Sequence, residues 1–315
     1  MVEGTPRFFN TAMELYNAQK YREGYTFVTE HAGDYPEYID RSFSFRICFA
    51  AKSGELDLAE ELLEDALDQG CFFSKKALRE DEDLIPLQKR EFFNRLVARD
   101  LNMLEDAQGN ARPLLQILRP NHRVTDEKDR FLMSLHCNLG NLRRYLPLWE
   151  FIPRTDWLAA IPQSSQVGGS HTFVWDNKEI ALKEVRDHYQ TVLKHFTPDP
   201  QLSLMIGYSM GGHIALRAAL EQTFPIRGFL LVCPAFGEVD AWMPMIEAAQ
   251  GLGLKGYFLL GEMDEPVTTN AKAMQKILEQ HGINAGVEVF AGIWHEFPPD
   301  FEQVFERVTR EIFNE

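Results

Sequence analysis

The chain has 315 residues, of which 45% are hydrophobic, and a formal net charge of −15. This length suits about two domains of ordinary size, and the apolar fraction is enough to form a core. The acidic balance disfavours nucleic acid and anionic membranes as partners, and no run of about 18 apolar residues predicts a membrane span.

The N-terminal residues and the cysteines support two separate expectations. No basic segment followed by an apolar run opens the chain, which favours a cytoplasmic location. The four cysteines are scattered and show no CxxC spacing. We therefore expect free thiols and neither a disulfide framework nor a metal site.

Helical periodicity dominates residues 1–105. Apolar residues recur there at spacings of three and four, which places them on one helix face: Leu56, Ala59, Leu62, Leu63 and Ala66. The order apolar, small, apolar at Leu56, Ala59 and Leu63 repeats an earlier one at an offset of 35. The earlier triplet is Tyr21, Gly24 and Val28. Because tetratricopeptide repeats have a period of about 34, we predict a helical-hairpin domain that resembles them, ending before a polar turn at 106–110.

From residue 111 to 315 the pattern alternates between strand and helix. Short apolar runs predict strands at 113–118, 130–136, 157–161, 202–206, 228–232, 256–260 and 287–290. Helical patterns between most of these runs cover 178–196, 212–222, 268–281 and 301–313. Such alternation predicts an α/β fold, with a mostly parallel sheet flanked by helices on both faces.

A G-x-S-x-G motif lies at the end of the 202–206 strand. It places Ser209 between Gly207 and Gly211, just before an alanine-rich helical run. A serine on a tight strand-to-helix turn projects its hydroxyl above the sheet, and small residues on either side let the backbones pass closely. The backbone N–H of Met210 begins the helix and can donate to an oxyanion. Ser209 is therefore the candidate nucleophile.

A hydroxyl nucleophile needs a base and a group that orients the base. Asp264 follows the 256–260 strand, and His295 follows the 287–290 strand. The order nucleophile, acid and histidine is the order this kind of elbow requires. Glu262 and Glu265 flank the candidate acid, and Asp240, after the preceding strand, is a further rival.

Five motifs in order make residues 111–315 resemble the α/β-hydrolase superfamily, in its carboxylesterase and phospholipase-like branch related to dienelactone hydrolases. They are an LHGxGGN-like loop at 135–141, a PQSSQ segment at 162–166, the elbow at 207–211, a GxxD loop at 261–264 and a GxxH loop at 292–295. The resemblance implies that the backbone N–H of Asn138 pairs with that of Met210 as an oxyanion hole. Cys137 and Leu139 depart from the pattern, since glycines are usual there. Cys137 as nucleophile is a rival hypothesis that lacks a helix N-terminus behind it.

These features predict a serine hydrolase that cleaves an ester through an acyl-enzyme on Ser209, with no cofactor. Large apolar residues near the expected site favour an acyl or aromatic ester, and Trp242 and Trp294 are the candidate substrate contacts. Two other hypotheses stay open. One is a peptidase or thioesterase with the same triad. The other is a non-catalytic interaction module, in which the helical repeats bind a protein partner or mediate self-association.

Overall fold

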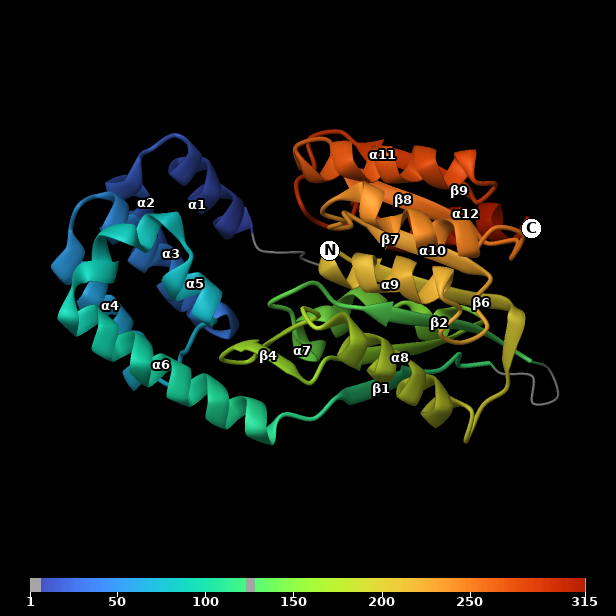
Figure 1. The fold of residues 1–315 in the computed structure, drawn as a ribbon, viewed down its shortest axis with the longest axis horizontal. Helices are drawn as coiled ribbons and strands as arrows, with labels where there is room; N and C mark the ends of the chain where they lie inside the picture. The colour runs from blue at the N-terminus through green and yellow to red at the C-terminus, as the bar shows by residue number, and fades with distance from the viewer. Residues whose placement is uncertain (1–6, 123–127, 315) are drawn as a thin grey trace. The chain divides into compact units, whose positions relative to one another are not determined.

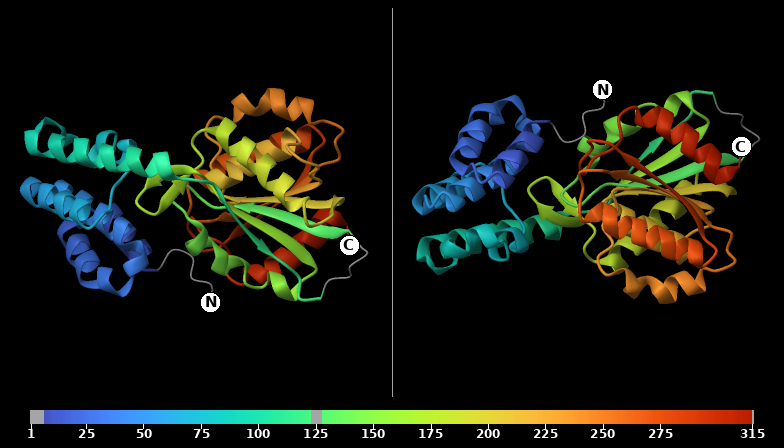
Figure 2. Two further views of the ribbon diagram at one scale, coloured as in Figure 1. Left: turned by 90° about the horizontal axis from the view of Figure 1, so that it is seen from below. Right: turned by 90° about the horizontal axis from the view of Figure 1, so that it is seen from above.

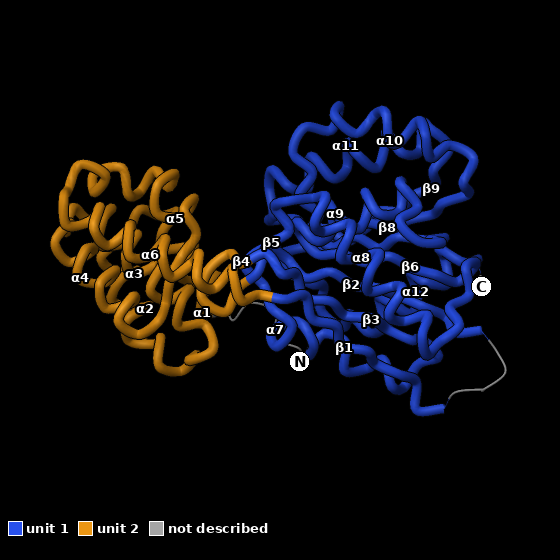
Figure 3. The backbone as a smooth tube through the Cα atoms, turned by 60° about the horizontal axis from the view of Figure 1, so that its bottom comes forward, with its two compact units in different colours: residues 1–2, 112–166, 173–315 blue, residues 3–111, 167–172 orange. Residues whose placement is uncertain are grey.

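The computed structural model describes residues 7–122 and 128–314 (Figure 1). It divides into two compact units, shown in separate colours in Figure 3. The helical unit ends at residue 111 and includes residues 167–172, and the α/β unit holds residues 112–166 and the chain from 173 onward. In the described parts of the chain, no helix is both long and apolar enough to cross a membrane.

Six α-helices lie in the described part of the helical unit. They are α1 (Arg7–Asn17), α2 (Tyr21–His31), α3 (Ile39–Lys52), α4 (Leu56–Asp68), α5 (Lys75–Arg79) and α6 (Glu91–Asn110). Short 3₁₀ segments join them: η1 (Ala32–Asp34), η2 (Pro36–Tyr38) and η3 (Glu82–Lys89). The predicted stripe on α4 is buried at Ala59, Leu63 and Ala66. The resemblance to tetratricopeptide repeats stays a prediction.

Gly24, the small residue of the predicted repeat, lets α2 pack closely against α3. A Cβ atom placed on Gly24 of α2 would lie 2.3 Å from the ring of Phe49 on α3. Phe49 is fully buried, so α2 and α3 approach closely only because residue 24 has no side chain.

The polar segment 106–110 is not a turn, which corrects the sequence-based expectation. Helix α6 continues to Asn110, and Gly109 lies within it. A Cβ on Gly109 would meet no atom within 4 Å, so an exposed glycine near a helix end is tolerated here without a change of conformation.

A seven-stranded sheet forms the centre of the α/β unit, in the order β1-β3-β2-β6-β7-β8-β9. The strands are β1 (Leu114–Leu118), β2 (Asp129–Leu135), β3 (Trp157–Gln163), β6 (Pro198–Tyr208), β7 (Gly228–Val232), β8 (Lys255–Gly261) and β9 (Asn284–Phe290). All neighbours pair in parallel except β1, which runs antiparallel to β3. All seven predicted strands are confirmed.

Helices cover both faces of this sheet (Figure 2). One face packs against α8 (Lys178–Val192), α9 (Met210–Leu220), α10 (Met243–Ala248) and α11 (Val267–Gln280). The other face packs against α12 (Phe301–Phe313), α7 (Leu142–Tyr145) and the 3₁₀ segments η4 (Leu146–Trp149) and η5 (Ile152–Arg154). Successive residues of one strand enter opposite cores, as Leu230 and Leu231 of β7 do.

A small hairpin was missed by the sequence analysis. Strands β4 (Gln166–Gly169) and β5 (Thr172–Val174) form a separate two-stranded sheet. Within the helical unit, the N–H of Ser170 at its tip donates to the Phe72 carbonyl at 2.8 Å. The segment is short and rich in glycine, so its sequence shows no strand alternation.

Candidate active site

Ser209 occupies the sharp turn between β6 and α9. Its φ is 57° and its ψ is −120°, a conformation that L residues rarely adopt. The backbone is held there by two hydrogen bonds: Ser209 N–H donates to the Val232 carbonyl at 2.9 Å, and Ala235 N–H donates to the Ser209 carbonyl at 3.1 Å.

The two glycines of the motif are required by close backbone packing. A Cβ on Gly207 would lie 2.1 Å from the Gly211 carbonyl oxygen. A Cβ on Gly211 would lie 2.3 Å from the His136 carbonyl oxygen, at the end of β2. The absence of side chains therefore brings the elbow against the loop that follows β2, where the predicted oxyanion donor Asn138 lies.

Asp264 and His295 meet on loops that follow β8 and β9. His295 Nδ1 lies 2.7 Å from Asp264 Oδ2, and the aspartate is 9% exposed. With Nδ1 engaged by the carboxylate, Nε2 is the nitrogen that remains to accept a proton from a nucleophile.

The rival acids have other surroundings. Glu262 Oε2 accepts from the Gly292 N–H at 2.9 Å, and Glu265 and Asp240 are exposed. Asp240 belongs to the 3₁₀ segment η6 (Val239–Trp242). Asp264 is thus the carboxylate that the structure places beside the histidine.

The side chain of Asn138, singled out above only for its backbone N–H, holds the loop after β2 through Asp176 and the backbone of Trp175. The Trp175 N–H donates to Asn138 Oδ1 at 2.8 Å, and Asn138 Nδ2 donates to Asp176 Oδ1 at 2.7 Å. Leu139 has a φ of 59° and is 54% exposed, so its departure from glycine costs backbone strain but no buried clash.

His136 fixes the same loop from within. It is fully buried, and Ser164 N–H donates to its Nε2 at 3.3 Å. Nδ1 is then the protonated nitrogen, and it donates to the Cys137 carbonyl at 2.7 Å. Burial lowers the pKa of His136 to about 4, so the ring is neutral at pH 7. Its place at the end of a predicted strand was the only sequence signal for this role.

The PQSSQ segment supports neighbouring loops by hydrogen bonds. Gln163 Oε1 accepts from the Leu142 N–H at 2.9 Å. Gln166 Oε1 accepts from the Asn177 N–H at 2.7 Å, and the Ser165 hydroxyl donates to Glu184. The motif therefore positions the loops that begin α7 and α8.

The two tryptophans predicted to contact substrate differ in burial. Trp242 is 2% exposed and packs edge-to-face against Phe236 and His213, so the structure places it in the core. Trp294 is only partly buried and directly precedes His295.

Two groups of donors are close enough for a metal ion within the described ranges. Cys233, Asp264 and His295 have ligand atoms within 4.8 Å of one another, as do Cys48, Asp81 and Asp83. Burial, followed by the charge of Asp264, raises the pKa of Cys233 to about 12, and the other two donors are already hydrogen-bonded to each other.

One carboxylate of the second group is paired with a lysine. Lys52 Nζ lies 3.2 Å from Asp83 Oδ1, which also accepts from the Tyr16 hydroxyl at 2.7 Å. Burial raises the pKa of Cys48 well above its usual range. In both groups, at least one carboxylate is therefore already engaged by another side chain of the protein.

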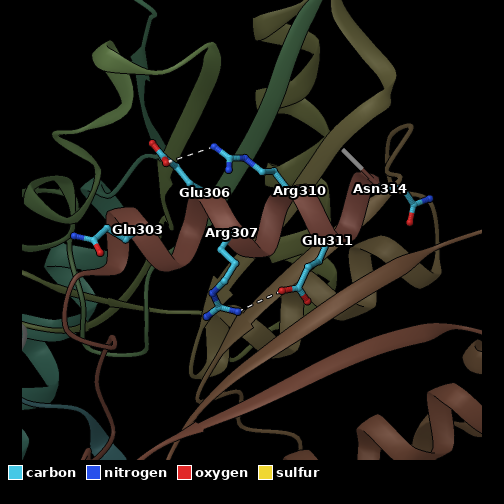
Figure 4. A pocket seen from close by; sticks show the side chains of 6 residues that line it. All are labelled: Gln303, Glu306, Arg307, Arg310, Glu311 and Asn314. Atoms are coloured by element: carbon cyan, nitrogen blue, oxygen red, sulfur yellow. Dashed lines mark hydrogen bonds and ion pairs between the residues drawn. The ribbon is translucent and has the colours of Figure 1, made fainter.

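A surface hollow follows the outer side of α12 (Figure 4). Its lining side chains all come from that helix and the residue after it: Gln303, Glu306, Arg307, Arg310, Glu311 and Asn314. Its charges pair along the helix, with Arg307 3.4 Å from Glu311 and Arg310 3.8 Å from Glu306. These groups do not converge on a common point, so we interpret the hollow as a solvated helix face.

Comparison with known proteins gives two family matches. Residues 5–108 match the model of the A/B hydrolase-like N-terminal domain, and residues 164–308 match the model of the dienelactone hydrolase family. No curated protein matches the chain.

Solved structures share the fold. An uncharacterized protein from Bacillus cereus ATCC 10987 is 24% identical, with a TM-score of 0.56, over 98% of this chain and 99% of that chain. The esterase PE8 is 17% identical, with a TM-score of 0.54, over 64% of this chain and 99% of that chain. At these identities the likeness establishes the fold and no particular substrate.

Proposed function

We propose that this chain is a serine hydrolase that cleaves carboxylic esters through an acyl-enzyme on Ser209, because residues 164–308 match the dienelactone hydrolase family. The observation that carries the proposal is the 2.7 Å contact between His295 Nδ1 and Asp264 Oδ2, together with the left-handed conformation of Ser209. We assign catalysis to residues 111–315 and leave residues 1–105 as a helical domain with a role in binding a protein partner or in self-association.

The proposed reaction uses the same groups in acylation and in deacylation. His295 Nε2 accepts the Ser209 proton as Oγ attacks the ester carbonyl, and Asp264 stabilises the imidazolium. The N–H groups of Met210 and Asn138 hold the negative charge of the tetrahedral oxygen. His295 then protonates the departing alcohol. In deacylation the same nitrogen takes a proton from water, whose oxygen attacks the acyl carbonyl, and returns it to Ser209 Oγ as the acid leaves.

The surroundings of the base bear on the substrate class. Trp294 lies beside the base and is partly exposed, which suits contact with an acyl or aromatic group. A cytoplasmic location is also part of the proposal. Thioesters and peptides are the competing substrates, since the same groups serve all three bond types.

The test is labelling with a fluorophosphonate probe combined with ester hydrolysis. We expect the purified protein to be labelled, and Ser209→Ala to lose both labelling and at least about 1,000-fold of the hydrolysis rate. Ser203→Ala is the matched control, because that hydroxyl lies earlier on the same strand and donates to the Asp199 carbonyl.

A panel of esters, thioesters and peptides then ranks the bond types by kcat/KM. A folded wild-type protein that shows no labelling would contradict the proposal. In that case a pull-down with the full-length protein would test the interaction-module hypothesis.

A further inference from the structure

The general base lies on a long loop. Between the end of β9 at Phe290 and the start of α12 at Phe301, no helix or strand supports His295. A catalytic group must stay within about 0.5 Å of its productive position. The hydrogen bond to Asp264 orients the ring, but it does not by itself fix the backbone that carries the ring.

Tyr208 holds that backbone directly. Its hydroxyl donates to the His295 carbonyl oxygen, and its ring lies 5.3 Å from the imidazole and 5.1 Å from the ring of Phe297. Tyr208 is the last residue of β6 and immediately precedes Ser209. The residue next to the nucleophile in the chain is therefore also hydrogen-bonded to the backbone of the base.

Cys233 supports the same loop from the core. It follows β7 with a φ of 41°, and its N–H donates to the Leu259 carbonyl at 2.9 Å. Its Sγ lies 3.7 Å from the Glu296 carbonyl oxygen and 3.9 Å from that of Trp294, the two residues that flank His295. The thiol is fully buried and remains protonated, so it is a donor.

The remaining carbonyl of this stretch is bonded to the acid loop. The Met263 N–H donates to the Ile293 carbonyl at 2.9 Å. A Cβ on Gly261 would lie 2.2 Å from the Trp294 carbonyl oxygen, so the two loops are in direct backbone contact. Within the loop, the Glu296 N–H donates to the Trp294 carbonyl at 2.9 Å. Each carbonyl from 293 to 296 therefore has a donor: the Met263 N–H, the Glu296 N–H, the Tyr208 hydroxyl and the Cys233 thiol, in that order.

We propose that Tyr208 is a positioning residue for the general base, acting through its hydrogen bond to the His295 carbonyl, with Cys233 as the second support. The inference rests on the proposed function. It assigns a role to the residue between Gly207 and Ser209 in the G-x-S-x-G motif: Tyr208 is covalently joined to Ser209, and its hydroxyl holds the His295 carbonyl.

The test is Tyr208→Phe, which keeps the ring and its packing and removes only the hydroxyl. We expect kcat for ester hydrolysis to fall about 10- to 100-fold with KM changed less than about twofold, because ground-state binding does not involve the hydroxyl. The rate constant for fluorophosphonate labelling should fall by the same factor, with the final stoichiometry unchanged. The imidazole N–H proton shared with Asp264 should exchange faster with solvent, as judged by its NMR signal.

Tyr257→Phe is the matched control. Tyr257 lies on β8, and its hydroxyl faces Arg307 on α12, so we expect no change in kcat. Cys233→Ala is the second variant, with an expected loss of about 3- to 10-fold in kcat, and Cys233→Ser should restore most of it because a hydroxyl can also donate.

The outcomes separate the inference from the proposed function. An active, labelled wild-type protein whose Tyr208→Phe variant keeps kcat and the labelling rate would overturn the inference alone. A variant that raises KM at unchanged kcat would also overturn it, since the hydroxyl would then serve substrate binding. Rates are normalised to the labelled fraction, so partial misfolding does not imitate either result. A wild-type protein without labelling would instead overturn the proposed function.

Discussion

At the scale of single residues, the acid of the candidate triad is distinguished from its neighbours by burial and by one contact. Asp264 is 9% exposed and lies 2.7 Å from His295, whereas Asp240 is exposed on η6. A buried carboxylate beside an imidazole holds the ring in one tautomer and stabilises its protonated form.

We predict that Asp264→Asn lowers kcat for ester hydrolysis by about 1,000- to 10,000-fold, because the amide favours the wrong tautomer of His295. Asp240→Asn, which removes the same charge from the rival position, should keep kcat within about twofold. Steady-state kinetics of both variants provide the measurement. Equal losses in the two variants would contradict this assignment of the acid.

At the scale of secondary structure elements, the end of α6 differs from the turn that the sequence predicts there. The glycine and polar residues at 106–110 favour a turn, but the helix continues through them. Gly109 has open space around its Cα, and its φ lies outside the left-handed region. An alanine is therefore compatible with both the conformation and the space at this position.

We predict that Gly109→Ala raises the free energy of unfolding of the helical unit by about 0.5–1 kcal/mol, because alanine loses less backbone entropy in a helix. Thermal unfolding followed by circular dichroism is the measurement. Gly54→Ala is the control with the opposite sign: its space is also open, but its φ of +79° strains any side chain, and we expect a loss of about 1 kcal/mol. A destabilised Gly109→Ala would indicate a turn.

At the scale of the whole molecule, the two units contain buried titratable groups whose pKa values shift in opposite directions. In the α/β unit, burial lowers the pKa of His136, His188 and His213 to about 4 each. In the helical unit, burial raises the pKa of Asp100 to about 7, and its Oδ2 has no hydrogen-bond partner among the described residues. Its Oδ1 accepts from the Phe73 N–H at 2.7 Å.

These shifts have opposite consequences for stability. The three histidines bind protons more readily when the protein is unfolded. Their contribution to the free energy of unfolding is therefore present above pH 6.5 and is lost as pH falls toward 4. Asp100 binds its proton more readily when folded, so its contribution is present below pH 4 and is lost as pH rises through 7. Each group contributes up to about 1.4 kcal/mol per pH unit inside its window.

We predict that acidification from pH 7 to pH 5 lowers the unfolding temperature of the α/β unit relative to that of the helical unit. Scanning calorimetry at both pH values is the measurement, and Gly109→Ala identifies the helical transition. In Asp100→Asn the helical transition should lose its gain on acidification, since the amide cannot titrate. An identical pH response of both transitions, in the wild type and in this variant, would contradict the prediction.

The sequence by itself determined the fold class and the order of the candidate groups. Local sequence patterns predict the strands, the helices and the elbow, because the hydrophobic period and the placement of glycines determine backbone conformation over a few residues. The seven strands and the positions of Ser209, Asp264 and His295 after them were predictable for that reason.

Only the tertiary structure decided which of these residues meet. It placed Asp264 and not Glu262 beside His295, and it buried Trp242 in the core. It also joined Tyr208 to a carbonyl 87 positions later in the chain and turned the 106–110 segment into helix. Contacts of this range depend on how β6, β7, β8 and β9 lie side by side, and no local pattern encodes that arrangement.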